Sequence, residues 1–180
     1  MFWKKMESKQ KSSRLEISRS PDASGVVPAA KSVAVSLRVN EFVEKAKEAD
    51  GFIFGSPVYY ANASGQISSF LDRAFYSGSA AFAYKPGAAV ASCRRAGTTA
   101  TLDQLNKYFT INCMPVVSSQ YWNMVHGNTP EEVVQDKEGL QIMRTLGSNM
   151  AWLLHCIQAG KEQGIALPER EPKEKTNFIR

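Results

Sequence analysis

The segment Ser56–Gln66 combines residue types that suit the recognition of a flat, polar ligand. It reads Ser-Pro-Val-Tyr-Tyr-Ala-Asn-Ala-Ser-Gly-Gln. The two tyrosines offer planar rings, and the short polar side chains and the loop backbone offer hydrogen-bonding groups. The apolar run Gly51–Gly55 precedes the segment, and the amphipathic run Ile67–Phe75 follows it. This order predicts a buried strand, a tight loop and a helix that begins at Ser64.

A second segment whose residues could bind a ligand is Ser92–Thr99, which reads Ser-Cys-Arg-Arg-Ala-Gly-Thr-Thr. It precedes a predicted helix, and the free N–H groups at a helix N-terminus can hold an anion or the carbonyl oxygens of a ring. An ordinary capped turn could have the same sequence, so the segment alone is a weak indication. Cys93 is the thiol placed nearest to such a ligand, and its reactivity would require a lowered pKa.

The third segment, Ser118–Gly127, contains Tyr121, Trp122 and His126. The carboxyl ends of parallel strands meet at one edge of an open sheet, so the three segments are expected to lie together. Taken alone, the two aromatic residues are more typical of packing than of cofactor contact. His126 is more typical of a surface or hydrogen-bonding histidine than of a catalytic one, and no acid–base pair stands out in the sequence.

Hydrophobic spacing predicts the elements that must position these segments. The predicted strands are 32–39, 51–56, 88–92 and 114–118, and the predicted helices are 41–49, 64–77, 98–109, a short one from 129 and 138–160. Residues 78–87 are predicted to be a surface connection. Because strand and helix alternate from 51 to 160, the expected fold class is α/β, a doubly wound parallel sheet with helices on both faces.

Composition and charge narrow the function classes. The chain has 180 residues, of which 43% are hydrophobic, as expected for one globular domain. No apolar run approaches the roughly 20 residues of a membrane span, so neither a membrane nor a secretory segment is expected. The excess of Lys and Arg lies within residues 1–38. A solvated, poorly ordered tail explains this better than a nucleic-acid-binding arm does.

The three cysteines, Cys93, Cys113 and Cys156, are widely spaced. No Cys-x-x-Cys pair or Cys/His cluster occurs, so no metal site is predicted. Free thiols are typical of a reducing compartment, and we expect the protein in the cytoplasm.

Several motifs together resemble a known family. Gly55–Tyr60, Ser64–Gln66 and Phe70–Arg73 resemble the flavodoxin-like NAD(P)H-dependent FMN reductases, a group that includes the multimeric flavodoxins and the iron–sulfur flavoproteins. Ser92–Leu105 and Met114–Gly127 resemble the next two flavin-side loops in one branch of that family. The likeness covers roughly residues 40–165, with the segments in the same order.

The resemblance implies a flavodoxin-like fold, bound FMN, NAD(P)H as the electron donor and a small-molecule electron acceptor. It also implies a homodimer or a homotetramer. By resemblance, two loops approach the flavin ring, and no side chain is assigned as a catalytic proton donor. The implied cofactor-binding residues are Ser56, Pro57, Val58, Tyr59, Tyr60 and Ser64 in the first loop and Arg95, Ala96 and Gly97 in the second.

The N-terminal region departs from the family pattern. The family begins with a strand and a polar loop that wraps the FMN phosphate, and only Ser18–Pro21 echoes that loop here. We therefore divide the chain into an atypical basic segment (1–38), a flavodoxin-like domain (39–165) and a charged tail (166–180). An alternative is a truncated or frameshifted relative with impaired FMN binding, acting only as an interaction or oligomerisation remnant. Codons for Val26–Lys31, read one nucleotide earlier, can encode Cys-x-Ala-Cys-Gly-Lys.

Overall fold

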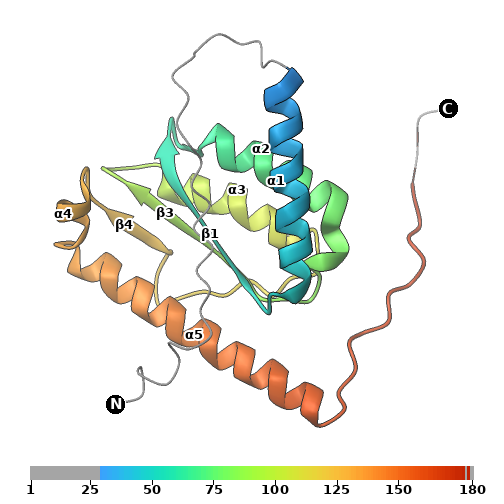
Figure 1. Cartoon of the computed structure of the whole chain (residues 1–180). Helices are drawn as coiled ribbons and strands as arrows, with labels where there is room; N and C mark the ends of the chain where they lie inside the picture. Colours follow the sequence, from blue (N-terminus) through green and yellow to red (C-terminus); the bar gives the residue numbers. More distant parts are fainter. Residues whose placement is uncertain (1–28, 177, 179–180) are drawn as a thin grey trace.

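The computed structural model describes residues 29–176 and 178, with side chains described from residue 38 onward. A four-stranded sheet in the order β2-β1-β3-β4 forms its centre (Figure 1). β1 (Phe52–Tyr59), β3 (Gly87–Cys93) and β4 (Met124–His126) run parallel, whereas the two-residue β2 (Asn62–Ala63) turns back antiparallel to β1.

Helices cover both faces of this sheet. The helices are α1 (Ala29–Glu48), α2 (Gly65–Gly78), the 3-10 turn η2 (Ser79–Ala81), α3 (Thr98–Thr110), α4 (Pro130–Val133) and α5 (Lys137–Glu162). α1, α2 and α3 share one apolar core with β1, and α5 packs against β3 from the opposite side (Figure 1). The predicted fold class is therefore confirmed, as an α/β fold with a mostly parallel sheet between helices.

The larger core is aromatic. The Phe54 ring on β1 stacks on that of Phe109 from α3, with centroids 5.4 Å apart. The rings of Phe75 and Phe82 stack at 4.4 Å. Phe82 is fully buried, so the predicted surface connection 78–87 instead contributes to the core. That prediction was wrong because the apolar residues of the segment are too few to show a periodicity.

The predicted strand 32–39 is also wrong, since these residues belong to α1. Val39 and Ala46 are buried, and Val43 packs against the same core. This spacing of four and three residues is helical and includes Val39, so the helix extends beyond the predicted start at residue 41. The alternation that suggested a strand is overridden by packing of this face on the sheet. The proposed boundary between 38 and 39 falls inside α1. Of the segment 1–38 that was predicted to be poorly ordered, residues 29–38 belong to α1 and residues 1–28 lie outside the described residues.

The predicted strand 114–118 forms only a single bridge, between Val116 and Gly87. β4 lies further on, inside the predicted third loop, where Met124–His126 pair with Ala91–Cys93. The chain therefore leaves the edge of β3 after Val117 and returns to it at Asn123, whose carbonyl accepts from Ala91 N–H at 3.0 Å. Sequence periodicity cannot show such a detour, because each of the two pairing segments is very short.

Candidate functional site

The β1–β2 hairpin is held in place from within. The buried Ser56 hydroxyl donates to the Pro57 carbonyl at 2.7 Å and accepts from Ser64 N–H at 2.9 Å. The hydroxyl of Ser64 in turn accepts from Ile67 N–H, so Ser64 is the N-cap of α2 as predicted. These bonds fix the first predicted loop as a rigid unit.

The turn of this hairpin projects two aromatic rings from the sheet edge. Tyr60 and Ala61 have φ angles of 48° and 60°, as in the two-residue turns that match the twist of paired strands. Residues other than glycine rarely adopt such positive φ angles. Tyr59 is 59% exposed and Tyr60 is fully exposed, so both rings are available to a flat ligand or to a partner.

The second predicted loop packs directly on this hairpin. Gly97 has a φ of 93°, and a Cβ built there would lie 2.7 Å from Ala61 Cα and 2.9 Å from Val58 Cγ1. Only glycine fits that contact without displacing backbone. The structure thus brings together the two loops that the sequence assigned to one site.

The start of α3 supplies hydrogen-bond donors at the same place. Thr101 N–H bonds to the Gly97 carbonyl, so the N–H groups at the very start of the helix have no acceptor in the helix itself. Arg95 and Ala96 just before them are exposed. Such donors suit the carbonyl oxygens on the edge of a flavin ring, so the residues present fit the ring half of FMN.

Cys93 does not fit the role of a reactive thiol. It is buried at the end of β3, and burial raises its pKa, only partly offset by the Arg95 N–H that points toward the sulfur. A raised pKa disfavours the thiolate, which is the nucleophilic form.

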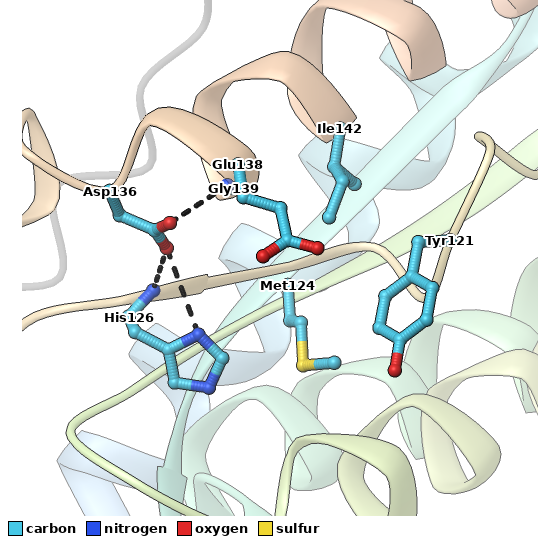
Figure 2. A pocket seen from close by; sticks show the side chains of 7 residues that line it. All are labelled: Tyr121, Met124, His126, Asp136, Glu138, Gly139 and Ile142. Atoms are coloured by element: carbon cyan, nitrogen blue, oxygen red, sulfur yellow. Dashed lines mark hydrogen bonds and ion pairs between the residues drawn. The ribbon is translucent and has the colours of Figure 1, made fainter.

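Sequence reasoning missed a pair formed by His126, at the end of β4, and Asp136, the N-cap of α5. The carboxylate of Asp136 accepts from the backbone N–H groups of His126 at 2.7 Å and Gly139 at 2.9 Å, and its Oδ2 lies 3.7 Å from His126 Nδ1 (Figure 2). Burial raises the pKa of Asp136, but these N–H groups and the imidazole outweigh it, so the pKa is lowered. Asp136 was recognisable from sequence as a helix cap, whereas its contact with His126 requires the unpredicted β4.

The pair lines a cavity of about 220 Å³ between β4 and the first turns of α5. Its other lining residues are Tyr121, Met124, Glu138, Gly139 and Ile142. Met124 also contacts the α3 start, since the Thr98 hydroxyl lies 2.9 Å from its sulfur. The cavity is therefore next to the donor-rich loop.

A model of the NADPH-dependent FMN reductase family matches residues 21–129. The chain belongs to this family. The match includes every predicted ring contact, and it begins at Pro21, within the segment 1–38 that the sequence set apart. At the level of the family, the function is that of a flavin-dependent oxidoreductase. The FMN reductase match confirms the resemblance inferred from the loop motifs.

Curated relatives of this chain include two iron–sulfur flavoproteins. One from Methanocaldococcus jannaschii is 34% identical over 133 residues, covering 67% of this chain and 66% of the relative. One from Methanosarcina thermophila is 28% identical over 130 residues, covering 69% and 66%. The chain thus spans just under two thirds of the length of these relatives.

Solved structures of similar shape include a flavodoxin, WrbA-like protein from Agrobacterium tumefaciens. It is 22% identical, covers 71% of this chain and 76% of its own, and has a TM-score of 0.48. An NADH:FMN oxidoreductase in its apo form is 21% identical, covers 74% and 67%, and has a TM-score of 0.47.

The cysteines of this chain do not fit the iron–sulfur part of these relatives' names. The 180 residues contain three cysteines, whereas a cluster held by cysteines alone needs four. Within the described part of the chain, no group of three His, Cys, Asp or Glu is placed to hold a metal ion. None of the described helices is both long and apolar enough to cross a membrane.

Proposed function

We propose that this chain is an FMN-dependent NAD(P)H oxidoreductase whose flavin ring lies at the edge formed by the β1–β2 hairpin and the loop Arg94–Gly97. The contact of Gly97 with Ala61 carries the proposal, because it joins two loops that are 36 positions apart into one surface. When bound, FMN would take a hydride from the nicotinamide and pass electrons to a small acceptor such as a quinone.

The roles proposed for the chain's residues are binding and orientation. Pro57, Val58, Tyr59 and Tyr60 are proposed to flank the ring, and the N–H groups around Ala96 to meet its carbonyl oxygens. Ser56 and Ser64 are proposed to act mainly by holding the hairpin, since the Ser56 hydroxyl bonds within the loop. Arg95 is exposed beside the ring edge and is proposed to add positive charge.

We also propose a homodimer or homotetramer in the cytoplasm. Four large aromatic rings are exposed near this edge, and such side chains are typical of contact sites. They support the proposal that a second copy of the chain covers the edge, and they belong to Tyr59, Tyr60, Tyr121 and Trp122. All three cysteines are free, which is consistent with a reducing compartment.

A remnant with impaired FMN binding is the second candidate. The observation that favours it is the weak match of Ser18–Pro21 to the family's phosphate loop. In this case the two loops that are proposed to contact the flavin ring would persist without the contacts that hold the phosphate.

Titration with FMN and with riboflavin separates the two candidates. Flavin fluorescence should be quenched, and addition of NADH or NADPH with an acceptor should consume the nucleotide. Tighter binding of FMN than of riboflavin would show that the phosphate is held, because the two ligands differ in that group alone. Unquenched fluorescence with both flavins at high protein concentration would contradict the enzyme and support the remnant.

A further inference from the structure

His126 ends β4 beside the proposed flavin edge. It is the register partner of Cys93, the last residue of β3, and Gly127 N–H bonds to the Cys93 carbonyl at 3.0 Å. The loop Arg94–Gly97 leaves β3 at that same position. The backbone of His126 therefore lies beside the start of this loop, and its imidazole lines the cavity of Figure 2.

Asp136 is fixed so that it can orient this imidazole. Two backbone N–H groups hold its carboxylate, and Oδ2 faces His126 Nδ1 at 3.7 Å. A lowered pKa keeps the carboxylate ionised at neutral pH. A fixed negative charge beside Nδ1 favours the tautomer that carries its proton on that nitrogen. Figure 2 shows the second ring nitrogen pointing away from Asp136.

The surroundings of His126 are mixed in charge. Glu138 from α5 and Tyr121 from the preceding loop line the same cavity, as do the apolar Met124 and Ile142. Arg94, Arg95 and the buried Cys93 thiol lie on the β3 side. Glu132 of α4 is engaged with the Asn128 N–H at 2.6 Å. The cavity thus combines the apolar side chains of Met124 and Ile142 with polar groups, among them the imidazole, which can face the oxygen of a small carbonyl compound.

We propose that His126 gives a proton from Nε2 to an oxygen of a quinone-class electron acceptor, and that Asp136 is its positioning residue. The inference rests on the proposed function. A quinone becomes a hydroquinone by gaining two electrons and two protons. A hydride from the reduced cofactor supplies both electrons and one proton, and His126 supplies the other. The neutral imidazole that remains keeps its proton on Nδ1 and is reprotonated at Nε2 by water.

Two acceptors separate this role from simple binding. A soluble benzoquinone needs a proton during reduction, whereas ferricyanide takes electrons alone. His126→Asn and His126→Gln should lower kcat with the quinone by about 100-fold, the usual contribution of a positioned acid. The rate of ferricyanide reduction in these variants should stay within twofold of the wild-type rate. His155 is an exposed histidine on α5, and the control His155→Gln should change neither rate.

The possible outcomes are distinct. Equal losses with both acceptors, or an unchanged quinone rate in both His126 variants, would overturn the inference while leaving the proposed function intact. A wild-type protein that reduces ferricyanide but not the quinone would overturn it as well. Reduction of neither acceptor by the wild type would overturn the proposed function and this inference with it.

A measurement without flavin tests the positioning role. Nitrogen-15 shifts of the neutral His126 ring report which nitrogen carries the proton, and the wild type should show the Nδ1–H form. Asp136→Asn should reduce that population while keeping the helix cap, because Asn also caps helices well. Asp103→Asn, at an exposed position of α3, serves as the control. A wild-type ring in the Nε2–H form, or no change in Asp136→Asn, would overturn the role of Asp136.

Discussion

Gly97 lies against Ala61 so closely that a Cβ at position 97 would be 2.7 Å from the Ala61 Cα. Backbone atoms form the obstacle, so a side-chain rotation cannot relieve it. The φ of 93° at Gly97 adds a second constraint, since other residues are strained there. The contact therefore fixes the separation of the two loops that are proposed to bind the flavin ring.

Gly97→Ala should destabilise the protein and weaken flavin binding together. Strain and displacement of the hairpin should lower the free energy of unfolding by about 1–3 kcal/mol, measured by urea denaturation. Flavin affinity, measured by fluorescence quenching, should fall by roughly tenfold or more if the loops separate. Gly147→Ala is the matched control, because that glycine lies in α5 with no atom near a built Cβ. Comparable flavin affinity in both variants would contradict the proposed ring surface.

Ser56→Ala should also act on the hairpin. It removes the acceptor for Ser64 N–H and leaves a part-buried donor unpaired, at a cost of about 1–3 kcal/mol of stability. Thermal and urea denaturation measure this loss. Ser69→Ala, at an exposed position of α2, should have little effect. A Ser56→Ala protein with normal stability but poor FMN binding would instead indicate direct contact between the hydroxyl and the flavin.

The sequence predicted the two loop–helix segments of the proposed site better than the sheet that carries them. The hairpin and the α3 start are contiguous motifs, so their loop–helix character is readable from residue order. β4 is different, because three residues contain no periodicity and their pairing with Ala91–Cys93 depends on a detour from Val117 to Asn123. The contact of His126 with Asp136 depends on β4 and was unpredictable for the same reason. The alternation in residues 32–39 predicted a strand, but the same residues also fit the helical period. Where a sequence fits both periods, packing against the rest of the fold decides between them.

The Tyr108–Asp72 bond should make stability depend on alkaline pH. The Tyr108 hydroxyl donates to Asp72 Oδ1 at 2.5 Å, and burial together with this carboxylate raises the pKa of Tyr108. The folded state thus holds a proton that the unfolded chain loses near pH 10, so the stabilisation is full below that pH and is lost as pH rises through the folded pKa. Urea midpoints from pH 8 to 11 should fall more steeply in the wild type than in Tyr108→Phe. Parallel slopes would contradict the linkage.

Reconstitution with iron and sulfide should leave this chain without an iron–sulfur cluster, unlike what the names of its relatives suggest. Cys93 is buried with a raised pKa, and only Cys113 and Cys156 are exposed. Two available thiols cannot replace the four thiolates of a cluster. After anaerobic treatment and desalting, iron analysis should find well below one iron atom per chain, and the visible spectrum should lack sulfide-to-iron bands. Cys113→Ser and Cys156→Ser should match the wild type, and a stoichiometric cluster lost in both variants would show that copies of the chain assemble one between them.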